Sequence, residues 1–147
     1  MSRVDFYMLA SSDVRSRWVM ACRLVEKAYG QGNRVYLHTR SEADSAAFDD
    51  LLWTFRQGSF VPHQRFDAVS APNAAMPVWV GHGGEVPALG DVLINLDDQV
   101  PAGYEQYARV LELIDQDEAI RQSGRIRYRA YRVAGHELYD HDLSGST

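Results

Sequence analysis

The most chemically distinctive part of this sequence is a cluster of arginines and tyrosines near its C-terminus. Five of the fifteen Lys and Arg residues fall between Arg121 and Arg132, around the segment RIRYRAYRVAG. No Asp or Glu occurs between Glu118 and Glu137, so the arginines from Arg125 to Arg132 have no carboxylate four residues away to neutralise them. Arginine binds carboxylates and phosphates through paired hydrogen bonds. The cluster therefore predicts a site for an anionic partner.

A helical arrangement of this segment separates its side chains into two stripes. The basic stripe contains Arg121, Arg125, Tyr128, Arg129 and Arg132. The second stripe is apolar, and we expect it to pack on a sheet; it contains Ala119, Ile126, Ala130 and Val133. Arg127 lies outside both stripes. The alternative interpretation is a solvated helix face whose last arginines interact favourably with the helix dipole.

A second informative stretch is LLWTFRQGSFVPH, residues 51–63, where a predicted helix ends in a loop. It gathers aromatic, aliphatic and proline side chains, namely Trp53, Phe55, Phe60, Val61 and Pro62. Two interpretations stay open. The rings close the hydrophobic core, or they form an exposed apolar patch of the kind that marks a protein interface.

Familiar catalytic and cofactor motifs are missing from the sequence. The turn after the first predicted strand, ASSDVR, has no glycine, and Lys27 is the only lysine, so neither a dinucleotide fingerprint nor a phosphate-binding loop is present. No G-x-S-x-G elbow occurs. The glycine-rich GHGGEVPALG is predicted to be a hairpin turn, and HELYDHDL a mobile chain end rather than a metal site. We expect no catalytic residue, no metal and no cofactor.

Composition is typical of one globular domain. The chain has 147 residues, 46% of them hydrophobic, and a net charge of −5. An acidic average argues against general nucleic-acid binding, which needs a sustained basic surface. Without a signal peptide or a long apolar run, a cytoplasmic location is expected. The single cysteine, Cys22, is expected to be a buried, unreactive side chain.

Strand-like and helix-like segments alternate along the chain. Strands are predicted at Val4–Leu9, Arg34–Thr39, Pro77–Val80, Asp91–Leu96 and residues 108–114, with a short one around Arg65–Val69. Helices are predicted after a cap at Ser12 or Asp13, after Ser41, and from a cap at Asp115 to Ala134, with Gly135 as the stop. The pattern indicates one three-layer α/β domain over residues 1–143, with a mostly parallel central sheet flanked by helices, and a frayed tail at 144–147.

Four stretches together resemble a known family. VDFYML, LLWTFRQGSFVPH, DVLINL and above all YRAYRVAG occur here in the same order as in the chi subunit of bacterial DNA polymerase III, a component of the clamp-loader complex. The similarity extends over nearly the whole chain. It implies a topology like that of nucleotide-binding domains without the nucleotide site, and no enzymatic activity.

The resemblance also implies two partners. Chi proteins bind the acidic, phenylalanine-ending C-terminal tail of single-stranded DNA-binding protein, and the matching positions are Arg121, Arg125, Tyr128 and Arg129. They also bind the psi subunit, which links them to the clamp loader, and the family's aromatic and proline positions match Trp53, Phe60 and Pro62. The expected function is a replication adaptor that meets DNA only indirectly and no membrane. The alternative is a direct single-stranded nucleic-acid-binding module, with arginines on phosphates and tyrosines stacked on bases.

Overall fold

A computed structural model describes residues 2–58, 60–66 and 75–143 of the chain. The predicted tail at 144–147 lies outside the described residues. So do residues 67–69 of the short strand predicted around Arg65–Val69, which meets the observed strand β3 at Arg65.

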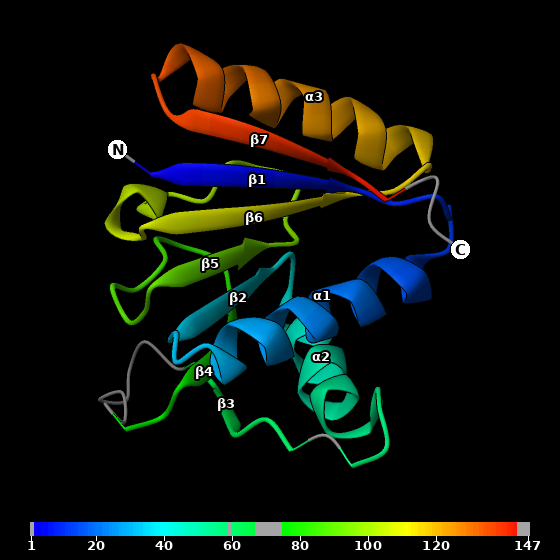
Figure 1. Cartoon of the computed structure of the whole chain (residues 1–147), viewed down its shortest axis with the longest axis vertical. Helices are drawn as coiled ribbons and strands as arrows, with labels where there is room; N and C mark the ends of the chain where they lie inside the picture. The colour runs from blue at the N-terminus through cyan, green and yellow to red at the C-terminus, as the bar shows by residue number, and fades with distance from the viewer. Residues whose placement is uncertain (1, 59, 67–74, 144–147) are drawn as a thin grey trace.

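The core of the molecule is one seven-stranded sheet in the order β3-β4-β2-β5-β6-β1-β7 (Figure 1). Every neighbouring pair is parallel, which confirms the predicted fold class. The strands are β1 (Arg3–Met8), β2 (Val35–Thr39), β3 (His63–Arg65), β4 (Val78–His82), β5 (Val92–Asn95), β6 (Arg109–Ile114) and β7 (Glu137–Asp142). The apolar β5 occupies the centre, as its sequence predicts.

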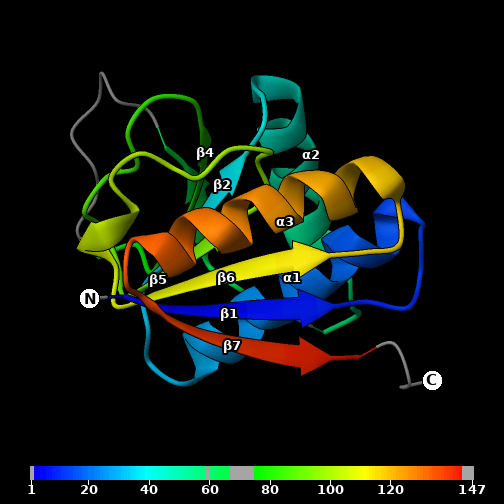
Figure 2. The ribbon, with the colours of Figure 1, turned by 90° about the horizontal axis from the view of Figure 1, so that it is seen from above.

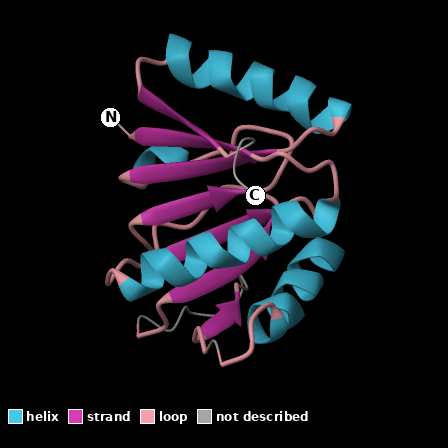
Figure 3. Cartoon of the chain, turned by 45° about the vertical axis from the view of Figure 1, so that its right-hand side comes forward, coloured by secondary structure: helices cyan, strands magenta, loops and turns pink. Residues whose placement is uncertain are grey.

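Helices cover both faces of the sheet. Helices α1 (Val14–Gly30) and α2 (Glu42–Thr54) pack on one face, and α3 (Glu118–Val133) crosses β6 and β1 on the other (Figures 2 and 3). A short 3-10 helix, η1 (Tyr104–Gln106), precedes β6. Each face has its own hydrophobic cluster: Ile94 contributes to the α1 side and Leu93 to the α3 side, as alternation along a strand requires.

Short polar side chains fix the helix ends. Asp13 caps α1 and Ser41 caps α2, as predicted. The cap of α3 is Asp117 instead of the predicted Asp115, which accepts a hydrogen bond from the Asp117 amide. The stop at Gly135 is confirmed, because its φ of 88° lets Gly135 and the next amide bond back to the last turn of the helix.

Two connections differ from the sequence predictions. GHGGEVPALG is not a hairpin turn, because β4 and β5 are parallel and both pair with β2, which lies between them. HELYDHDL is not a mobile end, because residues 137–142 form the edge strand β7 against β1. The buried Asp5 binds this edge, at 2.7 Å from the His141 Nε2. Cys22 is fully buried as predicted, and burial raises the pKa of its thiol to about 12.

The rotation of α3 about its axis is the largest correction. Gly124, Arg127 and Tyr131 face the sheet, and the apolar stripe predicted to pack there points into solvent. Ile126 is 72% exposed and Val133 is 81% exposed. Hydrophobic spacing alone therefore chose the wrong face of this helix.

A buried ion pair explains the rotation. The Arg127 Nε lies 3.1 Å from Glu112 Oε1, and both side chains are almost completely buried. The other Glu112 oxygen accepts hydrogen bonds from Tyr131 at 2.7 Å and from Asn95 at 2.9 Å. Burial raises the pKa of Glu112, and Arg127 opposes that shift most strongly. Because an unpaired buried carboxylate is very costly, α3 must turn Arg127 toward β6.

We expect Arg127→Met to lower the free energy of unfolding by about 3–5 kcal/mol, because it strands the Glu112 charge. The variant raises the folded-state pKa of Glu112 further above its unfolded value, so folding of the variant takes up a proton. The stability deficit of the variant relative to wild type should therefore shrink as the pH falls toward the unfolded-state pKa of glutamate. Urea denaturation at several pH values measures both effects. The control Arg132→Ala, at an exposed position, should change stability by less than about 0.5 kcal/mol; equal losses in both variants would contradict the assignment.

Candidate functional site

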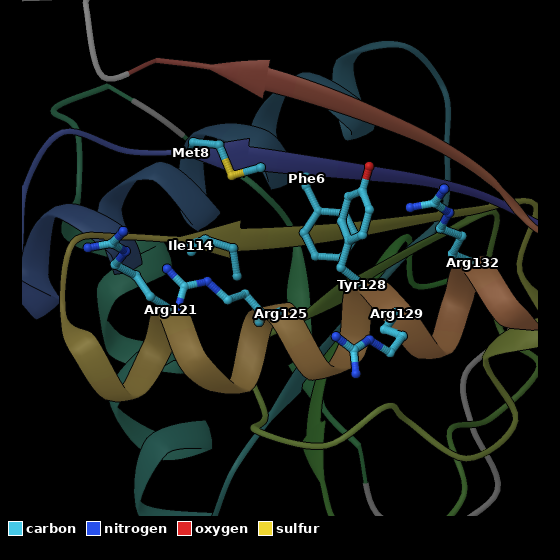
Figure 4. A pocket seen from close by; sticks show the side chains of 9 residues that line it. Phe6, Met8, Ile114, Arg121, Arg125, Tyr128, Arg129 and Arg132 are labelled. Atoms are coloured by element: carbon cyan, nitrogen blue, oxygen red, sulfur yellow. The ribbon is translucent and has the colours of Figure 1, made fainter.

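A hollow of about 450 Å³ lies between α3 and the sheet (Figure 4). All four residues assigned by resemblance to tail binding line it: Arg121, Arg125, Tyr128 and Arg129. The remaining lining residues are Phe6, Met8, Ile114, Gly124 and Arg132. The hollow therefore combines a row of arginines with an apolar floor.

The floor comes from strands that are far from α3 in the sequence. Phe6 and Met8 lie on β1, and Ile114 ends β6, where it pairs with Met8. Gly124 lets the helix approach: a Cβ there would lie 2.4 Å from Ile114 Cδ1. A glycine in mid-helix thus keeps the Ile114 side chain from being pushed into the hollow.

Tyr128 forms one end of the floor. Its ring lies 4.8 Å from the ring of Phe6, centroid to centroid, at an angle of 55°. Its hydroxyl donates a long hydrogen bond of 3.5 Å to Asp140 on β7. Held at its ring and its hydroxyl, Tyr128 presents a fixed apolar surface beside the arginines.

The arginine row is largely uncompensated. Arg121 lies 4.0 Å from Glu118, one helical turn earlier. Within the described ranges of the chain, no salt bridge involves Arg125, Arg129 or Arg132, and all three are exposed. In Figure 4, Arg121 and Arg125 lie near Ile114, whereas Arg129 points away from the strands. These free guanidinium groups attract an anion to the rim of an apolar cavity.

The opposite wall is acidic. Asp140 and Asp142 on β7 lie beside Phe6 and Met8 of β1, on the face that α3 covers. Together with Asp115 they line a second hollow of about 390 Å³, which shares Met8, Ile114 and Arg121 with the first. The cavity therefore has a cationic wall on α3 and an anionic wall on β7.

The crevice where this fold class binds nucleotides is bridged by the chain itself. Helices leave β1 and β6 toward opposite faces, and such a switch point is where ligands sit in open α/β sheets. Here the loop after β6 is joined to the loop after β1, because Gln116 donates hydrogen bonds to the carbonyls of Ser11 and Leu9. Beneath them the buried Arg17 donates to the Leu113 carbonyl at 3.0 Å.

Two other kinds of feature are absent from the described part of the chain. No group of three or more His, Cys, Asp or Glu side chains there is arranged to hold a metal ion. No helix among those residues is long and apolar enough to cross a membrane.

The second predicted group lies at the other end of the sheet. Trp53 on α2 is 50% exposed, and Phe60, just before β3, is 80% exposed. Pro62 is exposed as well, whereas Val61 is buried and Phe55 packs against the core. The Trp53 ring packs against the His63 ring at a tilt of 39°, with centroids 4.1 Å apart. Val61 and Phe55 thus contribute to the core, whereas Trp53, Phe60 and Pro62 are exposed.

Sequence reasoning found the arginines but missed the floor. Period-two alternation places Phe6 and Met8 on one face of β1 without showing which helix covers that face. Ile114 was predicted as a strand residue and Gly124 only as part of the helix. Arg132 was placed on the basic stripe but not in the site. No local signal joins residues from the first strand to the last helix.

Comparison with known proteins agrees with this architecture. A family model described as "DNA polymerase III chi subunit, HolC" matches residues 1–139. The DNA polymerase III subunit chi of Pseudomonas aeruginosa is 42% identical over 143 residues, which is 97% of this chain and 98% of that protein. The proteins of the same name from Haemophilus influenzae and Escherichia coli are 27% and 28% identical, covering 91% and 81% of this chain and 92% and 80% of their own lengths.

A distant structural likeness shows the fold alone. The crystal structure of T4 UvsW superposes with a TM-score of 0.64 at 8% identity, over 95% of this chain and 41% of that one. The chain thus spans well under half of that structure, and the likeness concerns the α/β architecture. The family model and the 42% identical relative, unlike this fold likeness, are matches of sequence, and they show that this chain belongs to the family of the DNA polymerase III chi subunit.

Proposed function

We propose that this chain is a non-catalytic adaptor of the replicative polymerase in the bacterial cytoplasm. Its α3 hollow binds the acidic, phenylalanine-ending C-terminal tail of single-stranded DNA-binding protein. Its Trp53–Phe60–Pro62 surface binds the psi subunit and, through it, the clamp loader. The observation that carries the proposal is the pairing of free arginines with an apolar cavity in one site.

The chemistry of the hollow suits a carboxylate-rich chain end with a large apolar last residue. The floor of Phe6, Met8 and Ile114 accepts a ring, and the arginines around it face the tail's carboxylates. Arg125 borders both the floor and the solvent, so we assign it the central contact with the carboxylates. Because these charges are exposed, binding should weaken as salt increases. A short flexible tail of this kind binds with a micromolar dissociation constant, about 8 kcal/mol.

Direct single-strand binding is the competing function, and the site supports it less well. The net charge of −5 does not provide the sustained basic surface that general single-strand binding needs. Tyr128, which the alternative would stack on a base, already packs on Phe6. An oligonucleotide shift assay without partner protein separates the two functions, because the adaptor binds weakly or not at all.

The two proposed surfaces suit simultaneous binding of two partners. The arginine hollow lies where α3 crosses β6 and β1, whereas Trp53 and Phe60 lie next to β3, at the opposite edge of the sheet (Figure 1). Neither partner therefore covers the other's site. Once the psi subunit holds this chain on the polymerase, the effective concentration of the tail-binding hollow near the tails of single-stranded DNA-binding protein is raised.

Arg125→Ala should weaken binding of a synthetic tail peptide about tenfold or more, because it removes charge-assisted hydrogen bonds. Isothermal titration calorimetry at low and high salt measures the loss and the expected decrease in salt dependence. The matched control is Arg23→Ala, an exposed arginine on α1 outside the hollow. Unchanged affinity of the Arg125 variant would reject the tail site.

Gly124→Ala should reduce the apolar part of the same interaction. The new methyl group displaces Ile114 into the floor, so a Phe-ending peptide should lose about fivefold or more in affinity. The same peptide ending in alanine should lose less, because it does not fill the floor. Equal losses for the two peptides would show that the last residue does not lie against Ile114.

Phe60→Ala should abolish or strongly weaken binding to purified psi subunit while leaving thermal stability unchanged. The ring is 80% exposed, so its removal opens no cavity, whereas an aromatic anchor at an interface contributes about 2 kcal/mol or more. Co-purification and calorimetry test this prediction. Val14→Ala, at an exposed apolar position on α1, is the control, and retention of psi binding by the Phe60 variant would contradict the assignment.

A further inference from the structure

An apolar strip on the outer side of α3 is not explained by the fold or by the hollow. The outer strip consists of Ile126, Ala130 and Val133, and all three are exposed. Ile126 and Val133 are among the most exposed large hydrophobic side chains of the described residues, at 72% and 81%. Seven residues apart, they lie about 10 Å from each other along the helix axis.

The walls of the hollow determine how a bound acidic chain leaves it. On the β7 side it would pass the exposed carboxylate of Asp140, with Asp142 and Asp115 in the adjoining hollow. On the α3 side it would pass Arg125, Arg129 and Arg132, whose guanidinium groups have no salt bridge within the described residues. Charge complementarity therefore directs the chain across α3.

Beyond the arginines, the chain reaches the outer strip. On a helix with 100° per residue, Ile126 lies roughly 140° around the axis from the hollow, in the direction of Arg129. With an outer diameter of about 10–12 Å, this arc measures about 14 Å. An extended peptide covers it in about four residues, at 3.3–3.6 Å each.

We propose that the outer strip is a second contact for the same acidic chain terminus, and that it receives an apolar side chain located about four to six residues before the terminal residue. This inference rests on the proposed tail binding at the hollow. Its ligand is an acidic peptide with two apolar anchors, one at the end and one upstream. The arginines between the two contacts pair with the intervening carboxylates.

A second copy of the chain fits the strip less well. A symmetric contact through Ile126 and Val133 would bring the arginine rows of two copies close together, with no carboxylate of α3 after Glu118 to compensate them. An acidic peptide instead neutralises these charges as it covers the strip.

The test uses two synthetic acidic nonapeptides that end in phenylalanine. They differ only at the fifth residue before the last, which is leucine in one and serine in the other. We expect wild-type protein to bind the leucine peptide about fivefold to tenfold more tightly in calorimetry, since burial of part of a leucine side chain supplies that factor. Equal affinities would overturn the inference while leaving the hollow's function intact.

The double variant Ile126→Ser, Val133→Ser localises the effect. It should lose the preference for leucine and keep the wild-type affinity for the serine peptide. Val14→Ser, at a 59% exposed position on α1, should keep the preference. A preference that persists in the double variant would overturn the inference. Circular dichroism confirms that the double variant is folded.

Three further outcomes separate the hypotheses. If Arg125→Ala no longer binds either peptide while wild type still prefers the leucine peptide, the two-contact arrangement is supported. Failure of wild type to bind either peptide rejects the proposed function and the strip together. A concentration-dependent dimer that the double variant abolishes, seen by light scattering, would overturn the inference in favour of a second copy.

Discussion

The ion pair between Glu112 and Arg127 is the constraint on which the functional surface depends. Glu112 is a carboxylate in the middle of β6 with no access to water, and among the described residues Arg127 is the only cation that hydrogen-bonds to it. Three neutral or charged donors, from α3 and β5, satisfy its oxygens. This arrangement sets both the position of α3 and its rotation, so that every other α3 side chain takes its place as a consequence.

The rotation produces two unusual surfaces at once. It places Tyr128, Arg121 and Gly124 above the open part of β1 and β6, where they complete the hollow. It also leaves Ile126 and Val133 in solvent. A helix chosen for apolar packing alone would bury these two side chains, and it would carry the arginine row away from Phe6 and Met8. A polar contact in the core thus determines which side chains α3 presents to the hollow and which it presents to solvent.

Much of the fold was predictable because its signals are local. Five of the strands, two of the three helix caps and the stop at Gly135 follow from apolar runs and from short polar or glycine side chains at element ends. The prediction of a hairpin between β4 and β5 was wrong, because a glycine-rich segment indicates a turn but does not show that β2 lies between the two strands. The strand β7 was missed because an edge strand that carries three carboxylates in six residues has little apolar signal.

The site was predictable only in part, for a related reason. Its arginines and Tyr128 cluster in the sequence, so helical periodicity alone places them on one stripe, and the resemblance assigns four of them to tail binding. The apolar floor is assembled from β1, β6 and α3, and no spacing rule connects these segments. The buried role of Arg127 was equally hidden, because its partner Glu112 looks like an ordinary charge within a strand until the sheet order is known.

The sheet order also affects when the site can form during synthesis of the chain. The first strand lies between the last two, so β1 has no partner until β6 has been made and no second partner until β7 follows. The proposed recognition site therefore does not exist on a growing chain, nor on a product that terminates early. Only a chain that extends through α3 can therefore form the hollow between α3, β1 and β6.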